Sequence, residues 1–301
     1  MRRASSKRCT PAAAAGFTLM ELVVVIVLLG ILAGGTMAFL TRSTQSYVNT
    51  AQRTELASAG RLAIERIARE LRNALPNSIR TNASCIEFMP VVAAGDYQGR
   101  SLTYSTGTAS APLPVAGTGG PASSFDALAL DFTPQAGKSY YLAVYPLGPG
   151  AGSGDPYSGA DPGALFPYAG KSTAGLPANV VRVSMDSAHR FARSAPMRRL
   201  FVVGQPVSFC VSGTDLERYA DYGILAAQPS AASAALAGKG ELLAQHVQLS
   251  DNGTAVTPFQ YAPGTLYRTA LVRLDLRLKR NVQGGDEWAR LSHEVQIRNV
   301  P

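Results

Sequence analysis

The chain has 301 residues and a formal net charge of +8, which is long enough for one or two domains with a sizeable core. Four of its 28 basic residues lie within residues 1–8, and removing them leaves 24 basic against 20 acidic residues. Most of the charge excess therefore sits at one end of the chain. This distribution argues against a broad basic surface and against nucleic acid as the main partner.

The dominant feature is an apolar run from Phe17 to Leu40, which holds one charged side chain, Glu21, and no proline. About 20 apolar residues at a rise of 1.5 Å span the roughly 30 Å hydrocarbon core of a bilayer. The basic residues before the run and the late first cation after it, Arg42, keep residues 1–16 in the cytoplasm. The sequence therefore predicts one membrane-spanning helix with the rest of the chain across the membrane.

A small residue, Gly16, stands before the apolar run. A secretory signal peptide places its small-residue cleavage site after the apolar segment instead. A cut between Gly16 and Phe17 would leave the whole hydrophobic helix on the mature chain. Glu21 would cost about 2.5–3.5 kcal/mol near the bilayer centre, so we expect it to have a partner. The new amine of Phe17, in the same chain or in a neighbouring subunit, would be a suitable cation.

The stretch Gly16-Phe17-Thr18-Leu19-Met20-Glu21 and the apolar helix after it resemble the type IV prepilin family, which includes the pseudopilins of type II secretion. The resemblance implies cleavage after Gly16 by a prepilin peptidase, N-methylation of Phe17, and a role for Glu21 in subunit assembly. It also implies three further partners: other major and minor pilins through the N-terminal helix, the inner-membrane assembly platform, and membrane lipid. Major pilins often carry a proline partway along this helix, where this chain has Ala38, and the difference favours a minor pilin.

Residues 52–75 continue as an amphipathic helix, which Pro76 ends at or before residue 75. The polar face is rich in Arg and Glu and includes the i,i+4 pairs Arg61–Glu65 and Glu65–Arg69. We expect the opposite, apolar stripe to pack on a head domain. The stripe consists of Leu56, Gly60, Ala63, Ile64, Ile67, Leu71, Ala74 and Leu75.

From Ser78 onward, short β-type runs separated by Gly, Pro and Ser predict a β-rich head. The clearest run, Tyr267–Arg280, alternates apolar with charged residues, as in a strand with one buried and one wet face. Gln283-Gly284-Gly285-Asp286 would turn the chain into Trp288–Arg298 and complete a terminal hairpin with a moderately long loop. The other candidate strands are Cys85–Val92, Ala127–Phe132, Tyr140–Tyr145, Asn179–Val183, Leu200–Val211 and Glu241–Leu249.

The segment Pro146–Pro177 is rich in Gly, Pro, Ala and Ser and predicts a long loop. Two interpretations stay open: a contact loop that uses Tyr157, Phe166 and Tyr168, or a mobile insertion. A second small-residue connector, Ala226–Gly240, is alanine-rich enough for a short helix.

Of the three cysteines, Cys9 lies in the leader that cleavage would remove. Cys85 and Cys210 remain as an even pair in a compartment that permits disulfides. Either they form a disulfide that closes a loop of more than a hundred residues, or they are two buried thiols.

The sequence offers no recognisable catalytic, cofactor-binding or metal-binding pattern. Its three histidines are far apart and lack metal-ligand spacing. Several aspartates lie in predicted turns, where Asx-type hydrogen bonding accounts for them without calcium. We therefore expect no enzyme, no cofactor and no metal. The residues considered are His189, His246, His293, Asp96, Asp155, Asp161 and Asp251.

Further segments resemble one branch of the prepilin family, the MshO group of the mannose-sensitive haemagglutinin (MSHA) pilus. They are residues 61–80, Cys85–Pro90, Leu216–Tyr219 with Tyr222-Gly223, and Glu294–Pro301. The last of these and the Glu- and Arg-rich helix are also similar to the larger minor pseudopilin of type II secretion.

The predicted fold class is α+β and pilin-like, with a long N-terminal transmembrane and stalk helix packed on a β-rich head. The expected domains are a cytoplasmic leader (1–16), which is removed, a transmembrane and stalk helix (17–75) and a periplasmic or extracellular head (76–301). The resemblance implies a minor pilin that starts assembly or sits at the tip, in the inner membrane before assembly and on the surface pilus afterwards. Two alternatives remain: a type II secretion pseudopilin, and a pilus-borne adhesin or DNA-binding subunit that uses the 146–177 loop or Arg198 and Arg199.

Overall fold

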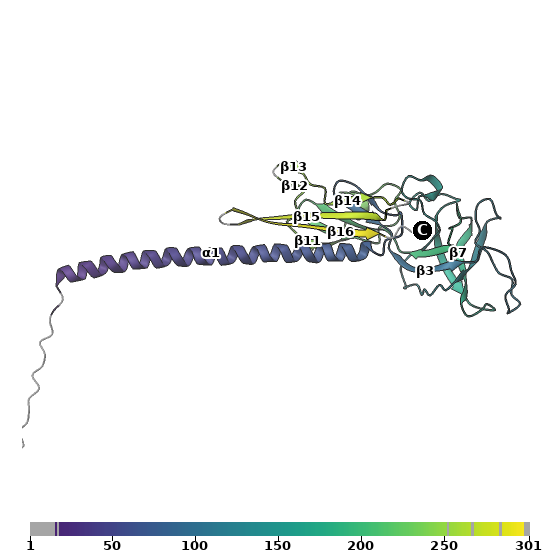
Figure 1. Ribbon diagram of the computed structural model, residues 1–301, viewed down its shortest axis with the longest axis horizontal. Helices are drawn as coiled ribbons and strands as arrows, with labels where there is room; N and C mark the ends of the chain where they lie inside the picture. The colour runs from purple at the N-terminus through teal and green to yellow at the C-terminus, as the bar shows by residue number, and fades with distance from the viewer. Residues whose placement is uncertain (1–15, 17, 252, 266–267, 283–284, 298–301) are drawn as a thin grey trace, which may run out of the picture. The chain divides into compact units, whose positions relative to one another are not determined.

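The computed structural model describes residues 16, 18–251, 253–265, 268–282 and 285–297. The chain divides into two compact units, Met1–Gln52 and Arg53–Pro301. One helix, α1 (Leu19–Leu71), begins in the first unit and ends in the second (Figure 1). Its end at Leu71 agrees with the prediction that it stops at or before residue 75.

The described part of the first unit is a largely exposed helix whose N-terminal half is apolar. Among the described residues, α1 is the one helix that is long and apolar enough to cross a membrane. The helix runs without interruption through Gly34 and Gly35. The hydroxyl of Thr36 donates to the carbonyl of Leu32, one turn earlier in the helix, at 2.9 Å. The predicted membrane-spanning segment is thus a regular helix.

In the second unit, α1 buries the apolar stripe that its sequence predicts. Leu56, Ile64, Ile67 and Leu71 all lie in one large hydrophobic cluster. The predicted ion pairs are wrong: within the described residues Glu65 makes no ion pair, and the i,i+4 pair on this face is Arg66–Glu70, at 3.4 Å. Arg66 and Glu70 also contact neighbouring strands, and these contacts fix their side chains on the inner side of the polar face.

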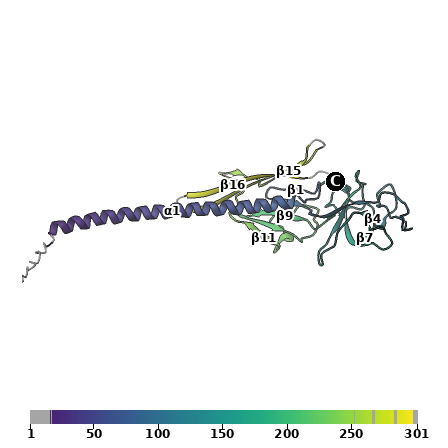
Figure 2. The same ribbon diagram turned by 60° about the horizontal axis from the view of Figure 1, so that its bottom comes forward.

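Two antiparallel sheets pack against the buried stripe of α1. We call these two sheets and residues 53–71 of α1 the body. Figure 2 shows β9 and β11 on one side of α1 and β15 and β16 on the other. The five-stranded sheet has the order β1-β2-β9-β10-β11. Its strands are β1 (Arg80–Thr81), β2 (Cys85–Phe88), β9 (Val207–Ser212), β10 (Asp215–Tyr219) and β11 (Gly240–Ala244). The three-stranded sheet consists of β14 (Phe259–Ala262), β15 (Ala270–Val282) and β16 (Gly285–Ile297), and a small pair, β12 (Ser250–Asp251) and β13 (Thr254–Ala255), lies apart.

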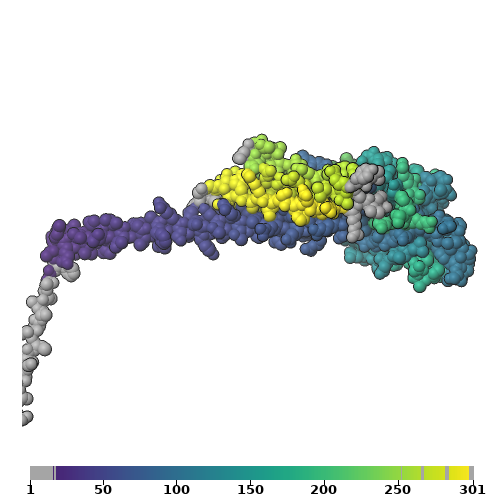
Figure 3. Space-filling model, in the orientation of Figure 1, coloured from purple at the N-terminus to yellow at the C-terminus, as the bar shows by residue number. Residues whose placement is uncertain are grey.

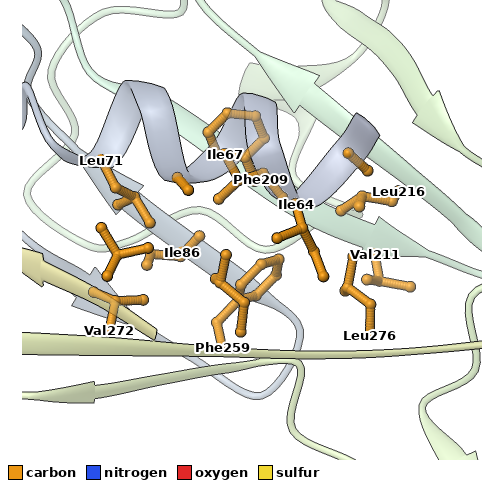
Figure 4. Packing of buried hydrophobic residues seen from close by; sticks show 14 of the residues in the cluster. Ile64, Ile67, Leu71, Ile86, Phe209, Val211, Leu216, Phe259, Val272 and Leu276 are labelled. Carbon is orange, nitrogen blue, oxygen red and sulfur yellow. The ribbon is translucent and has the colours of Figure 1, made fainter. Parts of the chain in front are cut away.

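Side chains from α1 and both sheets meet in a single core. Figure 4 shows Ile64, Ile67 and Leu71 of α1 facing Phe209 of β9 and Phe259 of β14. These side chains are at most 6% exposed. Burial of apolar surface contributes about 25 cal/mol per Å², so this packing is the main stabilising contribution to the folding of the body.

The alternating pattern of β15 is confirmed. Val272, Leu274, Leu276 and Leu278 are fully buried, and the residues between them face outward. Figure 3 shows the outer surface of the hairpin in yellow. Val282 of β15 pairs with Gly285 of β16, so the hairpin loop is shorter than the moderately long loop that the sequence predicts. Parts of the predicted hairpin lie outside the described residues: Tyr267, Gln283, Gly284 and residues 298–301.

All the strands of a closed six-stranded barrel lie in sequence between β2 and β9. The strand order is β3-β4-β7-β6-β5-β8. In Figure 1 the barrel, with β3 and β7 labelled, and the β15–β16 hairpin occupy opposite ends of this unit. The strands are β3 (Val91–Tyr97), β4 (Ala122–Leu128), β5 (Tyr141–Ala143), β6 (Leu165–Ser172), β7 (Val180–His189) and β8 (Arg199–Val203), with a single 3₁₀ turn, η1 (Gly152–Gly154), between β5 and β6. A second 3₁₀ turn, η2 (Ala234–Leu236), lies in the body between β10 and β11.

Two predicted strands are each split in the structure. The expected strand Cys85–Val92 breaks at Met89-Pro90, and Leu200–Val211 breaks at Gly204-Gln205-Pro206. Proline lacks the amide proton that a central strand needs, so each proline ends its sheet pairing. The two breaks mark where the chain leaves the body for the barrel and where it returns.

The prediction of a long unstructured loop at Pro146–Pro177 is wrong, because β6 lies within it. Its aromatic residues pack within the chain, with Tyr157 buried and Phe166 and Tyr168 half-buried. The hydroxyl of the buried Tyr157 donates to the carbonyl of Ser78 at 2.8 Å, Phe166 stacks on His189 at 4.0 Å, and Tyr168 lies edge-on to Phe132. The short η2 turn lies within the second connector, where a short helix was expected.

The remaining strand predictions are wrong in length, and one of them is also displaced along the chain. The strand expected at Ala127–Phe132 is instead β4, which ends at Leu128 because Ala129 adopts a positive φ of 53°. The strand expected at Asn179–Val183 extends to His189, and those expected at Tyr140–Tyr145 and Glu241–Leu249 are shorter. These bounds depend on the partner strands of the barrel and sheet, which local sequence patterns do not specify.

Candidate functional site

The first turn of α1 carries the residues that the sequence singles out. Gly16 is exposed and non-helical, and α1 begins three residues later at Leu19. The Thr18 hydroxyl accepts a hydrogen bond from the amide of Glu21 at 3.2 Å. This bond is one half of a capping box, in which a Thr at the N-cap satisfies the free amide three residues on. Phe17, the residue expected to be cleaved and methylated, lies outside the described residues.

Glu21 is exposed in the first helical turn, where a negative charge interacts favourably with the helix dipole. In the part of the chain that the structure describes, no side chain pairs with its carboxylate. Leu22 to Leu32 continue from it as an exposed apolar surface. Within the described residues, the structure thus presents an unpaired carboxylate at the beginning of an apolar helix.

Cys85 and Cys210 form a disulfide in the structure. They are register partners on β2 and β9, with a Cα–Cα distance of 4.1 Å and both side chains fully buried. The bond lies in the body, and the loop that it closes contains every strand of the barrel.

A buried ion pair lies where the barrel meets the body. Arg80 Nε is 2.5 Å from Glu87 Oε2, and the hydroxyl of Tyr222 donates to Glu87 Oε1 at 2.8 Å. Burial raises the pKa of the Glu87 carboxyl, while Arg80 and Tyr222 act in the opposite direction. The guanidinium also lies 3.7 Å from the ring centroid of Tyr157, so the pair connects the two regions. A signal for this site exists in the sequence, since Glu87 interrupts the apolar run Cys85–Met89.

A second buried ion pair lies in the barrel. Asp126 receives hydrogen bonds from Arg182 Nε at 2.7 Å, from the amide of Ala111 at 2.8 Å and from the hydroxyl of Tyr104 at 2.9 Å. Burial alone would raise the pKa of Asp126, but these donors outweigh it and the pKa is lowered. The pair is structural: its carboxylate is fully satisfied.

The histidines and turn aspartates remain scattered. In the described residues, no group of three or more His, Cys, Asp and Glu side chains is placed to hold a metal. His189 is buried beside Asp161, with 3.1 Å between Nδ1 and Oδ1, and burial lowers its pKa. Asp251, expected in a turn, instead contacts both Arg277 and Arg290. Asp155 accepts the amide of Tyr157, as an Asx turn requires.

An apolar helix with Gly16 before it and Glu21 in its first turn, followed by an α+β unit, is the organisation of a type IV pilin-like protein. Residues 12–37 match the family described as the prokaryotic N-terminal methylation motif, which supports a role of the pilin or pseudopilin type. No curated protein and no solved structure matches the chain. The match covers the motif and part of α1, so the barrel and the sheets are described by their own geometry.

Proposed function

We propose that this chain is a minor pilin of an MSHA-type type IV pilus, of the MshO group, that starts pilus assembly or sits at the pilus tip. The observation that carries the proposal is the methylation motif at residues 12–37, joined to an apolar helix and an α+β unit. The MSHA branch rests on the resemblance of residues 61–80 and of the segments around Cys85 and Cys210. The role is assembly and not catalysis.

In this proposal a prepilin peptidase removes residues 1–16, and the amine of Phe17 is methylated. Glu21 pairs with the Phe17 amine of a neighbouring subunit, and its exposed carboxylate, which has no ion-pair partner among the described residues, supports this role. Residues 17–75 form the transmembrane and stalk helix, which contacts lipid, other pilins and the assembly platform. Residues 76–301 form a head that is periplasmic before assembly and lies on the surface pilus afterwards.

The inserted barrel favours a low copy number. It adds a whole six-stranded region between β2 and β9. A thin filament repeats its subunits closely, and a bulky region is difficult to accommodate at every position. At a tip or in a priming complex this restriction does not apply.

The direct test is N-terminal mass spectrometry of washed membranes and of sheared surface filaments from the native cell. We expect a peptide that begins at methylated Phe17, present in the filament fraction in substoichiometric amounts. An unprocessed start in both fractions would contradict the prepilin proposal. A stoichiometric amount in filaments would contradict the minor role.

Deletion separates the pilus from the secretion pseudopilus. Loss of surface fibres and of adhesion supports the MSHA-type pilin, whereas loss of enzyme export with fibres intact assigns the chain to type II secretion. Salt-sensitive retention of DNA by the purified chain, with fibre number unchanged, would favour the DNA-binding alternative.

A further inference from the structure

A groove of about 450 Å³ lies between the end of α1 and the barrel. Arg72 and Asn73 line it from the segment that directly follows α1, and Asp96 and Arg199 line it from β3 and β8. Small and apolar residues, among them Ala94 and Phe201, complete the lining. The groove therefore combines an apolar floor with four polar side chains.

The backbone holds this groove in shape. Asp96 pairs in register with Arg199, and Ala94 with Phe201, so all four side chains project from one face of β3 and β8. The amide of Val91 donates to the carbonyl of Asn73 at 2.8 Å and fastens the end of α1 to the first residue of β3. Both sides of the groove are thus fixed by main-chain hydrogen bonds.

The polar side chains of the groove are unpartnered. Within the described residues, Arg72, Arg199, Asp96 and the amide group of Asn73 make no ion pair and no side-chain hydrogen bond, and all four are exposed. Other arginines of this unit, such as Arg80 and Arg182, are paired with carboxylates. Two free guanidiniums at the two sides of one groove are available to a ligand.

The chemistry of these groups indicates the class of ligand. Guanidinium groups bind carboxylates through paired hydrogen bonds. Asp96 can accept from hydroxyl groups, and the amide of Asn73 can both donate and accept. The apolar floor at Ala94 and Phe201 suits the C–H face of a sugar ring. Asp96 disfavours a polyphosphate more than a single carboxylate, because its negative charge would repel each of several closely spaced phosphates.

We propose that this groove binds an acidic sugar, a hexuronic acid, with its carboxylate between Arg72 and Arg199 and its hydroxyls on Asp96 and Asn73. The proposal is independent of whether the chain serves a pilus or a pseudopilus. A second cavity of about 490 Å³ shares Arg72 and Asn73 and extends to Glu294 and Gln296, which gives room for a neighbouring sugar unit. The ligand is accordingly either a free acid or one unit of an acidic polysaccharide.

The test uses the full chain in detergent micelles, with D-galacturonate, tri-galacturonate and neutral D-galactose as probes. Isothermal titration calorimetry should give a dissociation constant on the order of 1 mM for galacturonate, as expected for a ligand of this size. Galactose should bind at least about 10-fold more weakly, because it lacks the group that the guanidiniums bind.

Variants locate the site. Arg199→Gln and Arg72→Gln should each weaken galacturonate binding about 10-fold or more, through loss of charge-assisted hydrogen bonds. The matched control is Arg193→Gln, an exposed arginine that does not line the groove and whose loss changes the net charge equally. It should leave binding unchanged. Because Arg72 and Arg199 are exposed and unpaired, both variants should keep the parent's melting temperature.

Several outcomes would overturn the assignment: no heat with galacturonate, equal binding of galactose, or an equal effect of Arg193→Gln. Binding of a DNA duplex that depends on Arg199, with none of galacturonate, would assign the groove to phosphate instead. Tighter binding of the trisaccharide, with a larger effect of Arg72→Gln, identifies a polysaccharide as the source. Equal affinities for galacturonate and tri-galacturonate would identify a single, free uronic acid as the ligand.

Discussion

The body and the barrel build their cores from different kinds of element. In the body, the continuous apolar faces of α1 and of the long strand β15 form the large cluster around Ile67. In the barrel, whose strands have between 3 and 10 residues, side chains from many short strands and connections meet in the interior, among them Leu142, Val183 and Phe125. A closed barrel of few strands has an interior narrow enough for side chains to fill. The barrel core therefore depends on closure of the sheet, whereas the body depends on the apolar faces of a helix and a hairpin.

The two regions are joined by polar contacts as well as by packing. Leu75 and Met89 pack against Tyr157 and Phe201, and Arg80 lies over the Tyr157 ring. The guanidinium of Arg80 also donates to the carbonyls of Leu225 and Ala226 at 2.8 and 2.7 Å. Because each region nevertheless has its own hydrophobic core, we expect the two regions to unfold with separate sensitivities, and the following changes test this expectation.

Removal of the disulfide should have the largest effect. The bond joins residues 125 positions apart, and in the chain-entropy model its loss lowers the free energy of unfolding by about 4–5 kcal/mol. We expect Cys85→Ser with Cys210→Ser to reduce hydrogen-exchange protection in β2 and β9 first, because the barrel strands pair only with one another. Mass-spectrometric exchange on the full chain measures this, with the chemically reduced parent as a second reference. Equal loss of protection in the barrel would show that the two regions form one cooperative unit.

Loss of the cation at the junction should come next. In Arg80→Ala the fully buried Glu87 loses its cation and retains the hydrogen bond from Tyr222, so it must either stay charged in a buried site or take up a proton, and this should cost about 3–5 kcal/mol. The control removes both charges: Arg80→Met with Glu87→Leu should restore most of the stability. Denaturant unfolding followed by tyrosine fluorescence measures both. A loss under 1 kcal/mol in the single variant would mean that water reaches Glu87 and that the pair does not hold the junction.

The body could be predicted from the sequence because its signals are local. The apolar stripe from Leu56 to Leu71 and the alternation in β15 each appear within one continuous segment. The barrel could not, since its closure depends on pairs such as Ala94 with Phe201, which are far apart in the chain. Pro90 and Pro206 give the only local sign of its boundaries, and they read as ordinary strand breakers.

The N-terminal motif and the groove also differ in how far the sequence predicts them. Gly16, Phe17 and Glu21 form a contiguous motif, so their predicted role follows from sequence alone. The groove residue Arg72 directly follows α1, and Arg199 lies on β8. They come together because β3 pairs with β8 and the amide of Val91, the first residue of β3, donates to the carbonyl of Asn73. No spacing rule relates them.

A change confined to the body should have a smaller effect. A Cβ added at Gly60 would lie 2.5 Å from Leu291 Cδ1 and 3.0 Å from Leu278 Cδ1. Gly60→Val should therefore lower the free energy of unfolding by about 1–3 kcal/mol through overpacking, with barrel protection unchanged. The matched control on the same helix is Leu62→Ala, an exposed side chain whose loss should stay within about 0.5 kcal/mol. Urea midpoints give both values, and a neutral Gly60→Val would mean that the hairpin moves freely away from α1.

The smallest effect concerns pH and belongs to the barrel. His189 is fully buried between Phe166 and Phe191, and burial lowers its pKa, with Asp161 acting in the opposite direction. The unfolded chain therefore binds the proton at higher pH than the folded barrel does. The contribution of His189 to the free energy of unfolding is complete at pH values above about 6.5, the pKa of an unfolded histidine. At lower pH it decreases by up to about 1.4 kcal/mol per pH unit, until the pH reaches the pKa of the folded state.

His189→Phe should remove this acid-dependent loss, because a phenyl ring can keep the stacking on Phe166 without binding a proton. His293→Gln, on β16 of the body, serves as the control and should leave the pH dependence as in the parent. Hydrogen exchange between pH 7 and pH 5 should show the loss in β6 and β7, since these strands hold the two stacked rings. If protection in the body falls with the same midpoint, proton uptake at His189 is transmitted through the Arg80 junction and the two regions respond to acid together.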